Sequence, residues 1–380
     1  MSDLPHDSAF GRRSLLLGAG VAAAAAAGMA AAPAVGAAPT PAPAAGPGPG
    51  AVPEGRYRVD LHAHFLPPEY RRALLERGHF TIGGYPTPEW SVEAALAFMD
   101  RWGIQAQVLS TSDPGVGFLP GPEARDMARY CNTFAAELFD SHPDRFGAFA
   151  TLPMPDVPAS LAEIDYALGT LGLDGVTLLS AYDGVYLGDP RFEPVMAELN
   201  RRGAFVFVHP AAIPADAKPT LPLPDFIAEF TFDTTRAASL MIASGTLQRY
   251  PNIRFQLSHA GGTLPFLAPR LGLASQTPLG DLWPDELGKP SILDVDAGVR
   301  SMFYDTALSA APAPMRAVLE VTDRSHIVFG SDWPFSQLTF LGDGIDPAPR
   351  LSEVFTADER YEIERLNPLA QLPRLGGVLG

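Results

Sequence analysis

The sequence contains very little cysteine and very little lysine, and both shortages limit what the protein can be. Cys131 is the only cysteine among 380 residues, so the chain can form neither an internal disulfide nor a metal cluster of several thiolates. Any metal site must therefore be built from histidine and carboxylate side chains. Lysine occurs only at Lys218 and Lys289, and both precede a proline, which places them in predicted loops.

Positive charge is scarce as a whole, and no run of basic residues occurs. The chain has 27 lysine and arginine residues against 43 aspartate and glutamate residues, which gives a formal net charge of −16. Nucleic acid is therefore not an expected partner. Hydrophobic residues make up 47% of the sequence, which is enough for one large core or two ordinary ones.

The first 55 residues do not have the pattern of a folded domain. Residues 1–37 contain the pair Arg12-Arg13, then an alanine-rich apolar stretch and small residues suited to cleavage. This order resembles a twin-arginine signal, which implies the twin-arginine translocase as a partner and a periplasmic or extracellular location. An uncleaved membrane anchor is the alternative, and a signal that does not function would leave the protein in the cytoplasm. Residues 38–55 are rich in Pro, Ala and Gly and are predicted to be a flexible linker.

Residues 56–380 predict one (β/α)₈ barrel, the TIM-barrel form of the α/β class. Short β-branched or aromatic runs alternate with segments that have helical spacing, and eight such units fit this fold. An open doubly wound sheet is the alternative, but no G-x-G-x-x-G turn follows the first strand. The predicted strands are Arg58–Phe65, Gln105–Ser112, Phe146–Pro153, Gly175–Ala181, Ala204–Pro210, Phe255–Gly261, Met302–Leu308 and His326–Pro334. The predicted helical stretches are 91–102, 123–141, 158–171, 190–201, 233–249, 312–323 and 351–365.

The first predicted strand carries two histidines on one face. Because side chains alternate along a strand, His62 and His64 point into the barrel, while Ala63 points toward the helices. Two imidazoles on one face can bind one cation. They stand at the carboxyl end of the strand, where the active sites of this fold lie.

Three other predicted strands end in polar residues. The fifth is an apolar run that ends at His209, the sixth ends near His259, and the eighth ends near Asp332. Each residue alone is explained well enough by a hydrogen bond or a helix cap at a strand end. Together with the first strand they bring four imidazoles and one carboxylate to the mouth of the barrel, and few structural roles require such a set.

These motifs resemble the amidohydrolase superfamily. More narrowly, the segment from Asp60 to Pro68, with Ser258-His259-Ala260-Gly261-Gly262 and Gly330-Ser331-Asp332-Trp333-Pro334, looks like the aminocarboxymuconate-semialdehyde decarboxylase branch. That branch also includes γ-resorcylate and 6-methylsalicylate decarboxylases. The resemblance implies one divalent cation on His62, His64, His209 and Asp332, with His259 beside it as the acid and base.

The ligand types suit Zn²⁺ best, with Mn²⁺ as the alternative. A two-metal centre in this superfamily requires a carboxylated lysine at a strand end. Neither Lys218 nor Lys289 stands at a predicted strand end, so a mononuclear site is expected.

The resemblance leaves two reactions open for this site. A decarboxylase would release CO₂ from an aromatic or unsaturated carboxylic acid, with a protonated His259 delivering a proton to the carbon that loses CO₂. A hydrolase would use activated water to cleave a lactone, ester or amide, with Asp332 or His259 taking the proton. A non-catalytic binding protein is a third class, which an intact ligand set with an additional histidine makes the weakest of the three.

The sequence says less about the substrate pocket and the assembly. Phe65, Trp333 and Phe335 are predicted to form a flat apolar pocket for a small carboxylic acid, while Trp90 fits a core position equally well. An arginine such as Arg236 could hold a second carboxylate. The resemblance also implies a homodimer, although the sequence does not locate an interface.

Overall fold

The computed structural model describes residues 55–380 apart from four short segments, which are 215–216, 277–294, 337–343 and 345. The predicted export signal and all of the predicted linker except Gly55 therefore lie outside the described residues. In the part of the chain that the structure describes, no helix combines the length and the hydropathy needed to cross a membrane.

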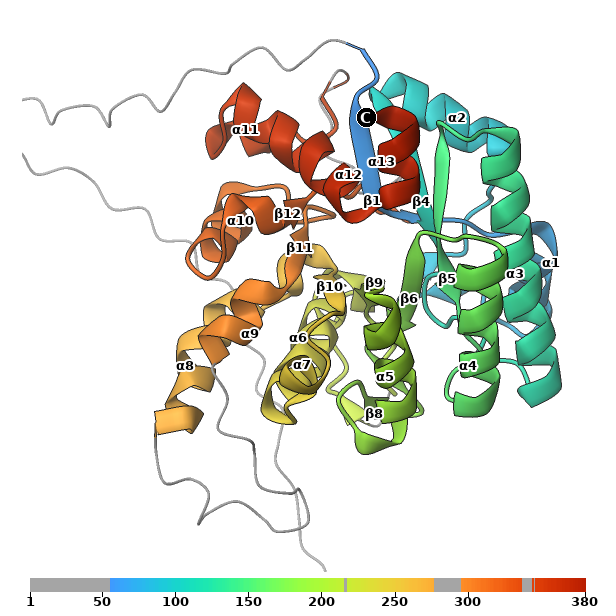
Figure 1. The fold of residues 1–380 in the computed structure, drawn as a ribbon, viewed down its shortest axis with the longest axis horizontal. Coiled ribbons are helices and arrows are strands. Elements are labelled where there is room, and N and C mark those ends of the chain that lie inside the picture. Colours follow the sequence, from blue (N-terminus) through green and yellow to red (C-terminus); the bar gives the residue numbers. More distant parts are fainter. Residues whose placement is uncertain (1–54, 215–216, 277–294, 337–343, 345) are drawn as a thin grey trace, which may run out of the picture. The chain divides into compact units, whose positions relative to one another are not determined.

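Eight parallel strands form one sheet in chain order, as Figure 1 shows. They are β1 (Arg58–His64), β4 (Ile104–Ser110), β5 (Phe146–Thr151), β6 (Gly175–Leu179), β9 (Phe205–His209), β10 (Arg254–Leu257), β11 (Phe303–Asp305) and β12 (Ile327–Val328). In a doubly wound sheet the strand order reverses at a central strand, whereas here each strand lies beside the previous one. The prediction of a (β/α)₈ barrel is confirmed.

The chain beyond β12 closes the barrel against β1. The amide of Leu61 donates to the carbonyl of Phe329 at 2.9 Å, and the amide of His64 donates to the carbonyl of Trp333 at 2.7 Å. Between them, the amide of Asp332 donates to the carbonyl of His62 at 2.7 Å. This closure places the residues that follow β12 directly beside the two histidines of β1.

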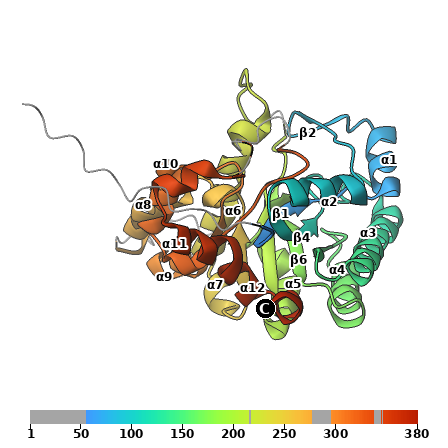
Figure 2. The ribbon, with the colours of Figure 1, turned by 90° about the horizontal axis from the view of Figure 1, so that it is seen from above.

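Helices surround the sheet, as the two views in Figures 1 and 2 show. They are α1 (Pro68–Glu76), α2 (Val92–Arg101), α3 (Gly121–Ser141), α4 (Val157–Ile164), α5 (Glu193–Arg202), α6 (Glu229–Ala243), α7 (Thr246–Arg249), α8 (Leu264–Gln276), α9 (Val295–Ser301), α10 (Pro312–Leu319), α11 (Ala357–Tyr361), α12 (Asn367–Gln371) and α13 (Pro373–Leu379). Helix α3 illustrates why they form: Ala124, Ala128, Cys131 and Ala135 recur at helical spacing and are buried. These small side chains let the helix pack closely against the sheet.

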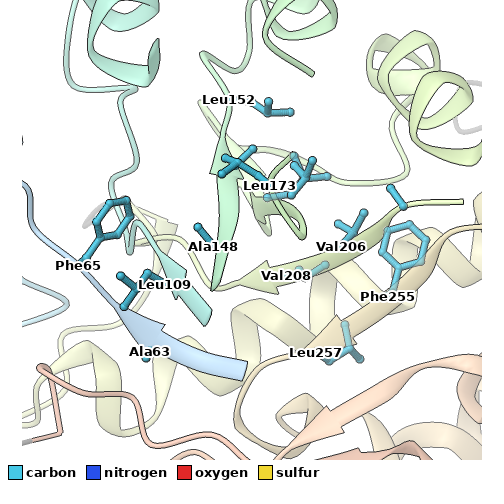
Figure 3. Packing of buried hydrophobic residues seen from close by; sticks show 14 of the residues in the cluster. Ala63, Phe65, Leu109, Ala148, Leu152, Leu173, Val206, Val208, Phe255 and Leu257 are labelled. Carbon is cyan, nitrogen blue, oxygen red and sulfur yellow. The ribbon is translucent and has the colours of Figure 1, made fainter. Parts of the chain in front are cut away.

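Two apolar clusters hold the domain together. The larger one lies between the strands and the helices, and Figure 3 shows members such as Leu109, Ala148 and Val206. The smaller one contains residues of the opposite strand faces, including Leu61, Val108, Phe149 and Phe207, and fills the barrel interior. Alternation along strands such as β9 separates the two sets, while β1 has a register shift between Asp60 and Ala63.

The C-terminal segment closes the amino-terminal end of the barrel. Leu372 and Leu375 belong to the interior cluster, and the guanidinium of Arg374 donates to the carbonyl of Phe146 at the start of β5. The predicted site residues lie at the opposite end, where the active sites of this fold are found.

The structure also contains elements that were not predicted. Two hairpins, β2 (Thr81–Ile82) with β3 (Tyr85–Pro86) and β7 (Ala181–Tyr182) with β8 (Val185–Tyr186), follow β1 and β6. Helices α1, α8, α9, α12 and α13 were missed as well, and prolines within or at the start of most of them weaken the helical pattern. Strand β12 is shorter than predicted, because the backbone leaves the extended conformation before Asp332, whose φ is +59°.

Candidate active site

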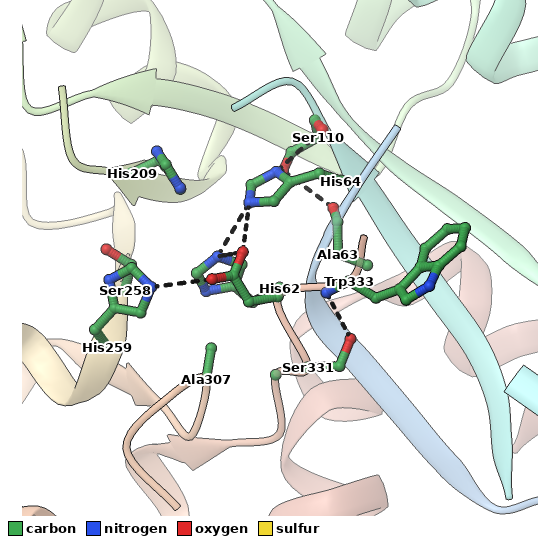
Figure 4. Close-up of polar contacts among 12 residues, drawn as sticks. His62, Ala63, His64, Ser110, His209, Ser258, His259, Ala307, Ser331 and Trp333 are labelled. Atoms are coloured by element: carbon green, nitrogen blue, oxygen red, sulfur yellow. Dashed lines mark hydrogen bonds and ion pairs between the residues drawn. The ribbon is translucent and has the colours of Figure 1, made fainter. Parts of the chain in front are cut away.

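The five predicted residues meet at the carboxyl end of the barrel. His62 and His64 lie on β1, His209 ends β9, His259 follows β10, and Asp332 follows β12. None of the five is more than 5% exposed. Figure 4 shows the four imidazoles facing a common region.

Each of the three predicted histidine ligands has its Nδ1 engaged by an acceptor. His62 Nδ1 lies 2.8 Å from Asp305 Oδ2, His209 Nδ1 lies 2.8 Å from the carbonyl of Pro210, and His64 Nδ1 lies 3.3 Å from the carbonyl of Ser110. This pattern puts the proton on Nδ1 and leaves the Nε2 lone pair of each ring available to a cation.

The available atoms converge closely enough for one metal ion. His62 Nε2 and His64 Nε2 face each other at 3.2 Å, and Asp332 Oδ1 lies 3.3 Å and 3.2 Å from them. One ligand atom each from His62, His64, His209 and Asp332 lies within 4.8 Å of all the others. The lone pairs of the two Nε2 atoms and the oxygen of Asp332 lie close enough together to bind one cation, and these donor types suit Zn²⁺ or Mn²⁺.

The electrostatics of the cluster also favour a positive occupant. Burial raises the pKa of Asp332, but the charge of His62 and hydrogen bonds from the surrounding histidines hold that pKa well below its usual range. Burial lowers the pKa of His62, but Asp305 and Asp332 outweigh it and raise the pKa to about 10. Burial lowers the pKa of His64 and of His209. The carboxylates thus attract positive charge, and a divalent cation on His62 Nε2 would take the place of the proton that they hold there.

His259 stands beside this cluster rather than within it. Its Nε2 lies 3.5 Å from Asp332 Oδ2, and its Nδ1 is buried with no hydrogen-bond partner among the described residues. The backbone here is strained, since His259 and Ala260 have φ of +55° and +56°. At the following Gly262, a Cβ atom would lie 2.0 Å from the carbonyl oxygen of Thr231, so a residue with a side chain does not fit.

Two buried carboxylates that were not predicted as functional hold the site in place. Asp305 accepts hydrogen bonds from His62 Nδ1 and from the backbone amide of His259, at 2.8 Å and 2.9 Å. Asp60 accepts from the amides of His62 and Ser331. Burial raises the pKa of Asp60 to about 6 against the opposing effect of these hydrogen bonds. A signal for Asp305 was present, because it is the one acidic residue in the apolar run that forms the seventh barrel strand.

A small cavity of about 20 Å³ opens at the centre of the site. Its lining includes His209, His259, Asp332 and Phe335, together with Ser112, Ile82, Tyr85, Phe226 and Phe230. Phe335, which was predicted to form part of the substrate pocket, is among these residues. The hairpin and loop residues of the lining were not predicted, since nothing in their local pattern points to the barrel mouth.

Phe65 and Trp333 lie elsewhere, which corrects the predicted pocket. Phe65 packs edge-on against Trp90 in the layer between strands and helices, and Trp333 stacks on Phe98 of α2. Phe65 follows the ligand His64 at the end of β1, so alternation turns its side chain away from the barrel interior. Trp333 lies beyond β12, where the backbone is no longer extended. Arg236 is exposed on α6 and does not line the cavity at the centre of the site.

Of the two lysines, the structure describes Lys218, which does not line the cavity at the centre of the site. Lys218 forms an ion pair with Asp225 in the segment after β9. Lys289 lies outside the described residues. A site with one metal ion therefore stays the prediction.

Comparison with known proteins agrees with this geometry. The family model described as amidohydrolase matches residues 59–374. The chain is 37% identical over 331 residues to the 6-methylsalicylic acid decarboxylase of Penicillium expansum, covering 85% of this chain and 98% of that protein. It is 36% identical over 338 residues to the decarboxylase yanB of Aspergillus niger, covering 83% and 89%. The name of the first relative matches the predicted decarboxylase branch, and the second is also named a decarboxylase.

A solved structure extends the agreement to the fold. The crystal structure of an amidohydrolase II superposes with a TM-score of 0.72 at 27% identity, covering 83% of this chain and 99% of that chain. The chain belongs to the amidohydrolase superfamily.

Proposed function

We propose that the protein is a metal-dependent, non-oxidative decarboxylase of an aromatic carboxylic acid. His62, His64, His209 and Asp332 would hold one divalent cation, and His259 would be the proton donor. The proposal is supported by the two decarboxylase relatives and by the convergence of the four ligand atoms.

The position of His259 carries the proposal. It is buried and directed toward the cluster, yet its Nδ1 has no hydrogen-bond partner among the described residues, so the ring is free to exchange a proton with a bound molecule. Asp305 fixes the backbone of His259 and the ring of His62 through one carboxylate. The proton donor and the metal ligand are therefore held in a constant relative position.

Zinc is the proposed metal, with manganese as the alternative that the same ligands accept. When bound, the cation would orient the substrate carboxylate and offset negative charge as CO₂ departs. The chain's own residues then complete the reaction. The bond between the ring carbon and the carboxylate carbon breaks, and its electron pair takes the proton of His259. CO₂ and the arene leave, His259 regains a proton from solvent, and no oxidant or reductant is consumed.

The proposed substrates are small aromatic acids, of which 6-methylsalicylate is the first to test because the relative from Penicillium expansum is named for it. A lactonase, esterase or amidohydrolase activity is the alternative reaction for the same residues. The two are distinguished by their products, since a hydrolase consumes water and releases an acid without CO₂.

Export and assembly are further proposals. The paired arginines of residues 1–37 support export through the twin-arginine translocase, and a fractionated culture would show whether the protein leaves the cytoplasm. A homodimer is proposed from the family resemblance alone. Light scattering after size-exclusion chromatography would decide between one and two chains.

The decisive test compares the wild type with His259→Asn. We expect the wild type to release CO₂ from 6-methylsalicylate in a metal-dependent way and to hydrolyse no lactone or aryl ester. The variant should keep its metal and lose about 10²-fold or more of the decarboxylation rate, because proton transfer is removed. Wild-type decarboxylation by His259→Asn, or acid release without CO₂ from the wild type, would overturn the proposal.

A further inference from the structure

A second, much larger cavity opens beside His259. Its volume is about 460 Å³, within the range of small-molecule sites, and its wall comes from the segments that follow β9, β10, β11 and β12. The small cavity at the predicted metal ligands measures about 20 Å³. A cavity of about 150 Å³ binds benzene, whereas about 15 Å³ already admits a water. The small cavity therefore has room for an ion or a water and none for an aromatic ring.

His259 and Phe226 line both cavities. They therefore mark the junction between the predicted metal ligands and the larger space. A substrate with its carboxylate directed toward the ligand cluster would have its ring in the large cavity and the carbon between them beside His259. This is the position at which the proposed proton transfer has to occur.

The wall of the large cavity is apolar in effect. Leu308, Ala310 and Phe329 contribute hydrocarbon surface. Three of the four hydroxyl groups on the wall are used within the protein, since Thr231 and Thr306 bond to backbone groups and Ser331 donates to Asp60. The fourth belongs to Ser309. Apolar substituents would gain from burial here, and an additional polar group would lose its hydration.

Charge on the wall is limited to one side chain besides His259. Among the described residues that line the cavity, this is Arg350, which pairs with Glu353 at 2.9 Å and is about half exposed. A second carboxylate on the ring would meet no buried cation among these residues. Its desolvation would go uncompensated.

We propose that the cavity bounded by Leu308, Ala310 and Phe329 binds the substrate ring and selects monocarboxylic aromatic acids that carry an apolar substituent. This inference rests on the proposed decarboxylase function. The cavity extends well beyond one ring, so an alkyl chain longer than methyl fits within it. Leu308 and Ala310 then determine how long a substituent the enzyme accepts.

The experiment changes the cavity in both directions. Ala310→Phe fills it, Leu308→Ala enlarges it, and Ala313→Phe is the matched control, because Ala313 is exposed nearby on α10 and does not line the cavity. The probes are salicylate, 6-methylsalicylate, 6-propylsalicylate and the dicarboxylate 4-hydroxyisophthalate. Binding of 3-propylphenol, the expected product of 6-propylsalicylate, is measured by calorimetry on each full-length protein and does not depend on turnover.

Ala310→Phe should weaken binding of 3-propylphenol by at least tenfold and lower kcat/KM for 6-propylsalicylate by at least tenfold, while salicylate changes by less than about threefold. Leu308→Ala should raise the preference for propyl over methyl severalfold. Ala313→Phe should change neither value. The dicarboxylate should be at least 100-fold poorer than 6-methylsalicylate.

Three outcomes would overturn the inference: unchanged phenol binding in a folded Ala310→Phe, an unchanged propyl-to-methyl preference in Leu308→Ala, or equal turnover of the dicarboxylate. Failure of the proposed function gives a different result. In that case no acid is decarboxylated, yet 3-propylphenol still binds to the wild type and loses affinity in Ala310→Phe, which supports the ring site alone.

Discussion

Replacing Asp305 with asparagine tests whether the predicted metal centre depends on a residue outside its ligand set. In the native protein, Asp305 Oδ2 accepts the hydrogen of His62 Nδ1 at 2.8 Å, and Oδ1 accepts from the amides of His259 and Ala307. Asparagine keeps the shape and one acceptor oxygen. The two backbone amides would hold that oxygen, so the new NH₂ group would face the N–H of His62.

The expected effect is a weaker metal site in a folded protein. A hydrogen bond to a charged partner is worth about 1.5–3 kcal/mol, and loss of such support for a histidine ligand typically costs about 10–100-fold in metal affinity. Since a tenfold change corresponds to about 1.4 kcal/mol, the two figures agree. We expect zinc to bind Asp305→Asn about 10–100-fold more weakly than the wild type.

Competition with a chromogenic zinc chelator measures this affinity directly. Asp174→Asn is the matched control, because Asp174 is also a buried carboxylate but pairs with Arg374 near the amino-terminal end of the barrel. It should lose stability and keep wild-type zinc affinity. A folded Asp305→Asn that binds zinc as tightly as the wild type would refute the reasoning.

Three other predictions concern stability. Arg360 is buried in ion pairs with Asp346 and Glu364, so Arg360→Ala should lower the free energy of unfolding by about 3–5 kcal/mol in urea, and a loss no larger than that of the exposed Arg191→Ala would contradict this. Burial raises the pKa of Asp113 from 3.8 to about 6, so the native state binds this proton more tightly and loses stability as the pH rises from about 4 to about 6. The advantage of Asp113→Asn over the wild type should therefore grow across that window by up to about 3 kcal/mol, and a Tm difference independent of pH would contradict it. Removing the metal with a chelator should lower the Tm, because a free zinc concentration of 100 times Kd stabilises the native state by about 2.7 kcal/mol. An unchanged Tm would speak against a bound cation.

The barrel was predictable because its signals are local. Each buried strand is a short apolar run, and the polar residue that ends a run such as Phe205–His209 marks the carboxyl end of the strand. The period of two in β1 was enough to direct His62 and His64 to one face. The same rule, applied to Phe65, would have turned it away from the pocket.

What could not be predicted depends on contacts distant in sequence. The acidic signal of Asp305 in the seventh strand does not identify its partner, because His62 is 243 residues away and only the closed barrel brings the two together. The cavities are likewise bounded by segments such as Phe226 and Ala348, whose local sequence carries no functional pattern. The positive φ values of His259 and Asp332 are set by these surroundings and not by residue type, since neither is glycine.

One measurement tests the central claim most directly. Metal-free protein is titrated with zinc or manganese while CO₂ release from 6-methylsalicylate is followed, and His62→Ala is treated in parallel. The account predicts that activity is absent at the start, rises in proportion to added metal and reaches its plateau at one ion per chain, with no activity in the variant. Full CO₂ release from metal-free wild type, or from His62→Ala, would contradict it.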